Sequence, residues 1–289
     1  MDSRRDSVDF YSIPFEDFPK HRNWTFTKVP DAGSLSRLVA EEVTAALKRA
    51  EAEGRKLMVI CPVGPLDYRL WAERMNREGT SGSHLITVNM DEYLDEGGAL
   101  IDASHPLSFR RFMRDNLFSR LEGRSRVPEA NIHFPSPRRP EQTTRLIEAH
   151  GGADLCYGGM GLTGHFAFND PPPRQEPCDG DAIRGSRTRV VRISPESQAQ
   201  MCMGGTGGNW DIIPPAAVTL GMHELLLSRC IHLTFMRSWH AGVLRRALFG
   251  PVSGRCPGSF VQRHGNVKVT LTELAASLPL IHVAQRIAE

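Results

Sequence analysis

Residues 56–62 read Lys-Leu-Met-Val-Ile-Cys-Pro, a short and almost continuous apolar run that ends at a proline. A strand that is buried on both faces does not need alternating polar positions, so such a run is typical of the inside of a parallel sheet. In residues 34–53, before this run, apolar residues recur at three- and four-residue spacing, and Gly54 supplies a stop signal. These residues therefore predict a helix followed by a buried parallel strand.

The same alternation continues towards the C-terminus. The pattern predicts further helices at about 67–78, 106–122, 141–150 and 239–248. It predicts further strands at about 84–88, 131–134, 153–157, 231–235 and 267–271. Strands that alternate with helices in this way usually form one sheet with helices on both faces. We therefore expect an α/β fold, a Rossmann-like, doubly wound and mostly parallel sheet.

The expected organisation is an N-terminal arm followed by one domain. Residues 1–28 mix aromatic and charged residues without a clear period, which indicates an arm laid on the body of the protein. Residues 29–289 are expected to form a single α/β domain. A proline-rich stretch at 171–186 and a glycine-rich one at 204–208 mark out a segment at about 187–215 that we expect to act as a lid.

The charge balance excludes several classes of protein. The 289 residues include 35 Lys and Arg against 33 Asp and Glu, a formal charge of +2. A nucleic-acid binder would show a clustered basic excess. The chain has no apolar run of about 18 residues, as a membrane-spanning helix requires, and its N-terminus lacks the apolar core of a secretory signal. We expect a cytoplasmic protein with no nucleic-acid or membrane partner.

The six cysteines are scattered singly and form no Cys-x-x-Cys pair. Such spacing in a long chain favours reduced, buried thiols over disulfides or a zinc site. We therefore expect no metal centre built on cysteine.

Ligands of an open parallel sheet bind beyond the carboxyl ends of its strands. Asp91 and Glu92 follow one predicted strand, where one carboxylate can point into a crevice and the other can brace the loop. Taken alone, they are better explained as helix caps or solvated acids. His165 and Asp170 lie five residues apart on a glycine-rich turn that follows another strand, a spacing that suits an imidazole oriented by a carboxylate. A purely structural histidine is the alternative.

Two motifs together resemble those of the glucosamine-6-phosphate deaminase family, which shares its superfamily with 6-phosphogluconolactonase. The first is Asn89-Met90-Asp91-Glu92-Tyr93, and the second is Gly-Met-Gly-x-x-Gly-His-x-Ala-Phe-Asn at 159–169. The resemblance extends to residues 104–109, 186–189 and 217–222, and it covers about 29–275. The chain is thus identified as a divergent member of this family.

The resemblance implies an aldose–ketose isomerase/deaminase that acts on an aminosugar or its phosphate. In this interpretation Asp91 moves a proton between C2 and C1 of the opened sugar. His165 moves protons during ring opening, and Asp170 orients it. Thr163 stands where the family has a second carboxylate beside the histidine. The resemblance implies no metal and no organic cofactor, a small sugar or sugar phosphate as partner, and a protein that could form homo-oligomers.

The positions that match the family's substrate contacts are Val63, Gly64, Pro65, Gly159, Met203 and His240. Pro65 removes an N–H group from the loop in which the family holds the phosphate. Met203 and His240 stand where the family has an arginine and a lysine. With an ordinary histidine pKa of about 6.5, His240 would supply positive charge only in mild acid. We therefore expect a weak preference for phosphorylated sugars.

Two other functions stay open at this stage. The replaced residues also fit a non-catalytic or altered-specificity sugar-binding homologue, and a 6-phosphogluconolactonase-like hydrolase would use His165 to activate water. The sequences of residues 90–93 and 167–169 favour the deaminase branch over the lactonase branch. Outside these motifs, we interpret Trp71, Trp239 and His232 as core residues, and the arginines at 187, 189 and 192 as mainly solvated charges.

Overall fold

The computed structural model describes residues 9–18, 24–64 and 66–279. Its strands are β1 (Trp24–Val29), β2 (Leu57–Cys61), β3 (Leu85–Asn89), β4 (Asp91–Leu94), β5 (Ile132–His133), β6 (Leu155–Gly158), β7 (Arg189–Arg192), β8 (Ala216–Thr219), β9 (Ile231–Phe235) and β10 (Val267–Thr272). Its α-helices are α1 (Ala32–Ala52), α2 (Tyr68–Glu78), α3 (Phe109–Asn116), α4 (Pro140–Ala149), α5 (Gly180–Arg184), α6 (Pro195–Gly205), α7 (Met222–Leu226), α8 (His240–Phe249) and α9 (Glu273–Ala276). Short 3-10 helices are η1 (Phe10–Ser12), η2 (Phe15–Asp17), η3 (Gly82–His84), η4 (Phe118–Arg120), η5 (Gly123–Ser125), η6 (Glu129–Asn131) and η7 (Pro257–Arg263).

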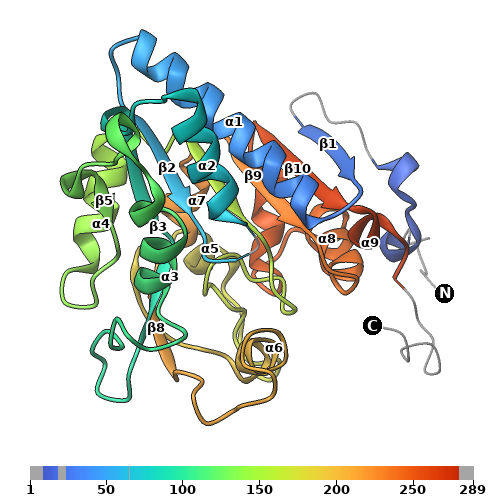
Figure 1. The fold of residues 1–289 in the computed structure, drawn as a ribbon. Helices are drawn as coiled ribbons and strands as arrows, with labels where there is room; N and C mark the ends of the chain where they lie inside the picture. The colour runs from blue at the N-terminus through green and yellow to red at the C-terminus, as the bar shows by residue number, and fades with distance from the viewer. Residues whose placement is uncertain (1–8, 19–23, 65, 280–289) are drawn as a thin grey trace, which may run out of the picture.

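Seven of the strands form one parallel sheet, in the order β1-β10-β9-β6-β2-β3-β5 (Figure 1). From β2 the chain runs outward through β3 and β5, and it then returns to the other side of β2 with β6. The direction of winding therefore reverses between β2 and β6. In folds of this kind the crevice at such a reversal is where ligands bind. The expected doubly wound α/β fold is confirmed.

Helices cover both faces of the large sheet. Within β2, Met58 and Ile60 belong to one apolar core, while Leu57, Val59 and Cys61 belong to the core on the opposite face. This alternation follows from the two-residue period of a strand. Both faces are buried, which explains why this stretch is apolar throughout.

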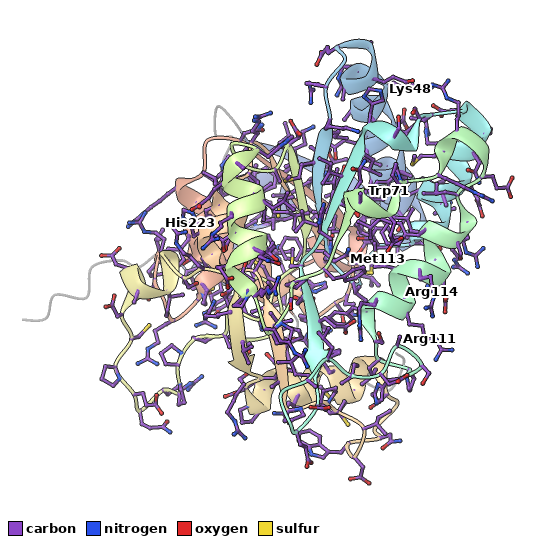
Figure 2. All side chains as sticks on the ribbon, turned by 90° about the vertical axis from the view of Figure 1, so that its left-hand side faces the viewer. Lys48, Trp71, Arg111, Met113, Arg114 and His223 are labelled. Atoms are coloured by element: carbon purple, nitrogen blue, oxygen red, sulfur yellow. The ribbon has the colours of Figure 1, made fainter. Side chains whose placement is uncertain are left out.

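The core beneath α1, α2 and α3 includes a buried aromatic pair. Trp71 is fully buried and stacks on the ring of Tyr68 at 5.6 Å, so its interpretation as a core residue is confirmed. Figure 2 shows Trp71 and Met113 inside this layer, whereas Lys48, Arg111 and Arg114 point outward. The charged faces of these helices thus meet solvent and their apolar faces meet the sheet.

A second, smaller sheet has the order β4-β8-β7 and is antiparallel. In Figure 1 it lies below the large sheet, with α6 beside it. The backbone passes from β3 to β4 through the single residue Met90. Residues expected at the end of a parallel strand therefore begin a strand of the second sheet.

Several boundaries differ from the sequence prediction, and helix α3 ends at Asn116 rather than near residue 122. Helix α3 begins at Phe109 rather than near residue 106, because the Ser108 hydroxyl caps it by accepting the N–H of Arg111. Strand β1 takes up the last residues of the segment expected to be an arm, extends to Val29 and pairs with β10 at the edge of the sheet.

Candidate active site

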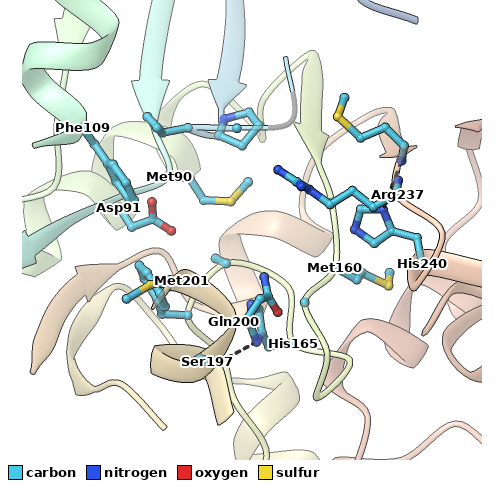
Figure 3. A pocket seen from close by; sticks show the side chains of 18 of the residues that line it. Met90, Asp91, Phe109, Met160, His165, Ser197, Gln200, Met201, Arg237 and His240 are labelled. Carbon is cyan, nitrogen blue, oxygen red and sulfur yellow. Dashed lines mark hydrogen bonds between the residues drawn. The ribbon is translucent and has the colours of Figure 1, made fainter. Parts of the chain in front are cut away.

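A cavity of about 260 Å³ lies at the carboxyl end of the large sheet. Its walls are formed largely by the residues that directly follow four adjacent strands, β3, β2, β6 and β9. Helices α3 and α6 and the start of α8 complete the lining (Figure 3). The lining residues are Pro62, Val63, Gly64, Met90, Asp91, Tyr93, Phe109, Gly159, Met160, Gly161, His165, Ala167, Phe168, Ser197, Gln200, Met201, Met236, Arg237, Trp239 and His240.

Asp91 presents a carboxylate to this cavity (Figure 3). Its side chain is buried, with a relative exposure of 6% for the residue. Burial, with a further contribution from the charge of Glu92, raises the pKa of Asp91 to about 8. Among the described residues none donates a hydrogen bond to this carboxylate. Such a group is poised to exchange a proton near neutral pH.

The neighbouring carboxylate of Glu92 points the other way, into the start of α3. It accepts the backbone N–H groups of Phe109 at 3.0 Å and Arg110 at 2.8 Å. The Arg110 guanidinium contacts the same carboxylate at 3.2 Å. Glu92 thus holds the start of α3, which carries Phe109 in the cavity wall. The two carboxylates are arranged as expected from the sequence, with one facing a crevice and the other bracing the loop.

His165, Asp170 and Thr163 come together as expected. The His165 Nδ1 atom lies 2.9 Å from Asp170 Oδ1 and 2.9 Å from Thr163 Oγ1, and the Thr163 hydroxyl donates to Asp170 Oδ1 at 2.8 Å. Burial alone would raise the pKa of Asp170, but hydrogen bonds from His165, Thr163 and Ser197 lower it to about 2. The ionised Asp170 accepts the Nδ1–H of His165, which leaves Nε2 as the unprotonated ring nitrogen.

The loop that carries this pair is held by close packing. A Cβ atom on Gly161 would lie 2.3 Å from His165 Nε2, so only glycine fits beside the ring. Ala167 adopts a φ of 53°, which is uncommon for a residue with a side chain. The fully buried Asn169 stabilises this turn by donating through its Nδ2 to the carbonyls of Phe166 and Leu220.

Of the positions that the resemblance matches to substrate contacts, Val63, Gly64 and Gly159 line the cavity, whereas Pro65 lies outside the described residues. Arg237 also lines it, and Figure 3 shows its guanidinium extending into the cavity. Among the described residues none forms an ion pair with Arg237. The resemblance matches His240 to the family's lysine, and Arg237 could substitute for it only if the local register differed.

His240 lines the cavity but carries no charge there. Its Nδ1 accepts the backbone N–H groups of Met236 and Arg237, both at 3.0 Å. Burial, with a contribution from the Arg237 charge, lowers the pKa of His240 to about 3. The expectation of a positive His240 in mild acid is therefore wrong, because a desolvated imidazole beside a guanidinium stays neutral.

Met203 does not reach the cavity. It lies on α6 with a relative exposure of 73%, so the expectation of a contact with substrate at this position is wrong. Residues three and four apart share one face of a helix, and the face of α6 that meets the cavity carries Ser197, Gln200 and Met201.

Sequence reasoning missed Ser197, Gln200 and Met201 because it assigned no helix to this segment. The signal was present in Ser194-Pro195-Glu196, since serine at the cap and proline at the first helical position are typical of a helix start.

The sequence interpretation of three residues outside these motifs is confirmed for one and corrected for two. His232 is buried and bonds Glu42 and Thr270, so its interpretation as a satisfied core residue is confirmed. Trp239 is half-buried and lines the cavity, which corrects its assignment to the core alone. Arg189 is not merely solvated, because its guanidinium donates to the Asn169 side chain at 2.8 Å.

No group of three or more metal-ligating side chains suited to a metal ion occurs in the described part of the chain. The thiols of Cys61, Cys156, Cys202, Cys230 and Cys256 are buried and free, and Cys178 is half-buried. Within the described ranges, every helix is too short or too polar to cross a bilayer.

Several known proteins are similar to this chain. It is 32% identical over 258 residues to the glucosamine-6-phosphate deaminase of Rhodopirellula baltica, a match that covers 86% of this chain and 94% of the relative. It is 29% identical over 243 residues to the glucosamine-6-phosphate deaminase of Caenorhabditis elegans, which covers 81% and 84% of the two chains. No protein-family model matches the chain.

Solved structures share the fold. A monomeric glucosamine-6-phosphate deaminase superimposes with a TM-score of 0.74 at 23% identity, covering 88% of this chain and 99% of the other. The 6-phosphogluconolactonase of Thermotoga maritima superimposes with a TM-score of 0.61 at 16% identity, covering 86% and 100%. The extent and identity of the match to the Rhodopirellula relative show that this chain belongs to the glucosamine-6-phosphate deaminase family.

Proposed function

We propose that this protein is an aldose–ketose isomerase/deaminase that converts an aminosugar, free or phosphorylated, into a ketose and ammonia. The observation that carries the proposal is the buried Asp91 carboxylate, which faces the same cavity as His165, the imidazole held by Asp170. One group can transfer a proton between carbons while the other handles the ring oxygen. The names of the relatives support this choice.

Ring opening is assigned to His165. Its unprotonated Nε2 takes the proton from the anomeric hydroxyl, the bond between C1 and the ring oxygen breaks, and the ring oxygen receives that proton. Asp170 and Thr163 hold the Nδ1 side of the imidazole in place. The negative Asp170 also stabilises the imidazolium that forms between the two transfers.

Proton transfer between carbons is assigned to Asp91. The ionised carboxylate removes the proton from C2 of the open aldehyde, and O1 takes up a proton to give an enolamine. The carboxylic acid then returns its proton to C1, while the nitrogen at C2 loses one proton, so that the net change is C2–H to C1 and N–H to O1 and the amine becomes an imine. Water adds to the imine, and ammonia leaves. A single carboxylate fixed on one side of a planar intermediate can serve both carbons.

Arg237 is assigned to a negative group at the far end of the substrate. Among the described residues its guanidinium forms no ion pair, and it lines the same cavity as Val63 and Gly64. The neutral His240 accepts at Nδ1 and therefore carries its proton on Nε2, which can only donate without charge. One arginine with neutral donors should therefore give a smaller preference for the phosphorylated sugar over the free sugar than two cations would give.

The test is ammonia release and exchange of the C2 proton with deuterated water, measured on glucosamine and on glucosamine 6-phosphate. We expect wild type to catalyse both and Asp91→Asn to lose at least about 10²-fold in both, because general acid–base groups contribute about 10²–10⁴-fold. Asp95→Asn is the matched control, since Asp95 lies in an exposed turn just after β4.

Three outcomes separate the functions. Binding without ammonia release or exchange would indicate a sugar-binding homologue. Hydrolysis of a sugar lactone that persists in Asp91→Asn would indicate the lactonase-like function. Full exchange by Asp91→Asn would remove this residue from the mechanism.

A further inference from the structure

The Asp170 carboxylate has a partner that does not belong to its own loop. Ser197, on α6, places its Oγ 2.9 Å from Asp170 Oδ1 and 3.0 Å from Oδ2. The same Oγ lies 3.0 Å from His165 Nδ1. The Ser197 residue is fully buried, with 2% relative exposure. A helix that is separate in sequence thus completes the surroundings of the pair.

The contact to Oδ2 distinguishes Ser197 from Thr163. Thr163 and His165 both contact Oδ1. Among the described residues, Ser197 is the one hydrogen-bond donor to Oδ2. A carboxylate held at one oxygen can turn about its last bond, whereas a donor that bridges both oxygens fixes its plane. Ser197 therefore fixes the orientation of the Asp170 carboxylate plane relative to the imidazole N–H.

The hydrogen-bond inventory allows these contacts together. A serine hydroxyl donates once and accepts twice. Its proton goes to the ionised Asp170, so its lone pairs remain available to the Nδ1–H of His165. The imidazole N–H is thereby surrounded by one carboxylate and two hydroxyls, all of which favour the tautomer with Nε2 unprotonated.

Helix α6 is docked on the cavity at two further points. The Gln200 side-chain oxygen accepts the backbone N–H of Leu162 at 2.7 Å, and the Tyr93 hydroxyl lies 2.7 Å from the Met201 sulfur. The Ser197 contact is therefore one of several contacts that hold α6 against the walls of the cavity. The pair has its full set of partners only while α6 occupies this position.

We propose that Ser197 is the positioning residue for the His165–Asp170 pair, supplied by α6 in a chain where Thr163 replaces a carboxylate. This inference rests on the proposed function, in which the pair performs ring opening. Other charged groups around the pair are Arg246, which donates to the Thr163 carbonyl at 3.1 Å, and Asp91 and Arg237 across the cavity. None of them contacts Asp170 Oδ2.

The test compares Ser197→Ala, Ser197→Thr and Ser194→Ala with wild type. Ser194→Ala is the matched control, because it removes the hydroxyl that caps α6 and leaves the Ser197 hydroxyl in place. The rates are measured on the closed-ring aminosugar substrate, with hydrogen or deuterium at C2. The histidine tautomer is measured separately by ¹⁵N NMR of the free protein.

We expect Ser197→Ala to lower kcat about tenfold, the effect of losing one hydrogen bond to a charged group. Because ring opening then limits the rate, the deuterium isotope effect at C2 should fall towards unity. The His165 signal should show a mixture of tautomers. Ser197→Thr, which keeps a hydroxyl, should restore both, and Ser194→Ala should keep the wild-type isotope effect and tautomer.

The possible failures are distinct. A Ser197→Ala variant with the wild-type isotope effect and a single tautomer overturns the role of Ser197. Equal changes in Ser194→Ala would also overturn it, because they would show that α6 had merely loosened. A wild-type protein that neither releases ammonia nor exchanges the C2 proton would instead overturn the proposed function, and the NMR comparison would still decide whether Ser197 sets the tautomer.

Discussion

Asp91 and Glu92 are consecutive residues of β4 whose carboxylates occupy opposite environments. The fully buried Glu92 accepts backbone N–H groups at the start of α3, while Asp91 faces the cavity with no hydrogen-bond donor among the residues that the structure describes. A strand turns successive side chains to opposite faces. The pair is thus one structural carboxylate and one chemically available carboxylate, and this difference leads to the first prediction.

Glu92→Gln should destabilise the protein and alter Asp91. An amide cannot accept from both N–H groups and from Arg110 as a carboxylate does, so unfolding free energy should fall by about 2–4 kcal/mol. Removing the neighbouring charge should also lower the pKa of Asp91. Denaturant unfolding checks the first effect, and a pH–rate profile displaced to lower pH checks the second. A profile that coincides with wild type would show that Glu92 has no electrostatic influence on Asp91.

The activity should increase with pH. Asp91 must be ionised to remove the C2 proton, and its pKa is raised to about 8. Below that value the ionised fraction grows about tenfold for each pH unit. We therefore expect kcat/KM to increase between pH 6 and 8 and then to level off. A flat profile over this range, with C2 exchange as the measured step, would contradict the assignment of Asp91 as the base.

Asp91→Asn should stabilise the protein, and more so at higher pH. The carboxyl keeps its proton in the folded state up to about pH 8 but ionises near pH 4 when unfolded, so wild-type stability falls as pH rises between these values. The neutral amide avoids this loss, and its advantage should grow by up to about 1.4 kcal/mol per pH unit between 4 and 8. Melting temperatures at pH 5 and pH 8 provide the measurement. A difference from wild type that does not change with pH would count against the raised pKa.

Arg237 should determine the preference for phosphorylated sugars. Losing a hydrogen bond to a charged group costs about 1.5–3 kcal/mol, so Arg237→Ala should weaken glucosamine 6-phosphate binding by about 10–150-fold. Free glucosamine should bind almost as before. Calorimetry of both ligands gives the two dissociation constants. Equal losses for the two ligands would show that Arg237 supports the cavity rather than the anion.

The same measurement at two pH values tests the state of His240. Its pKa is lowered to about 3, so it is neutral at pH 6 and at pH 8. Arginine keeps its charge throughout, and a phosphate monoester gains negative charge above about pH 6. The ratio of the two dissociation constants should therefore hold or increase from pH 6 to 8. A preference that weakens over this interval would restore a charged His240.

The residues of the site were predictable where local chemistry determined them. The continuous apolar run of β2 and the glycine loop after β6 placed Val63, Gly64 and His165 at the same edge of the sheet. Asp170 was identified by its spacing from the histidine. These features depend on short-range sequence patterns, and in the structure Val63, Gly64 and His165 line one cavity while Asp170 contacts His165 from behind it.

Other features depend on tertiary contacts and were not predictable. Strand β4 is four residues long and includes two acids, so nothing marked it as a strand before β8 was seen to pair with it. Ser197 reaches Asp170 only because α6 folds back over the loop. An ungapped alignment placed Met203 at the position of the family's arginine, but the turn of α6 directs its side chain outward.

A buried carboxyl that holds its proton near neutral pH couples ligand binding to the release of that proton. When the ammonium group of an aminosugar arrives beside Asp91, the new positive charge favours the carboxylate. The proton is then released to the buffer as the substrate binds. The observed heat of binding must consequently vary with the ionisation enthalpy of the buffer, and the affinity for an aminosugar must increase with pH even where the sugar itself does not titrate.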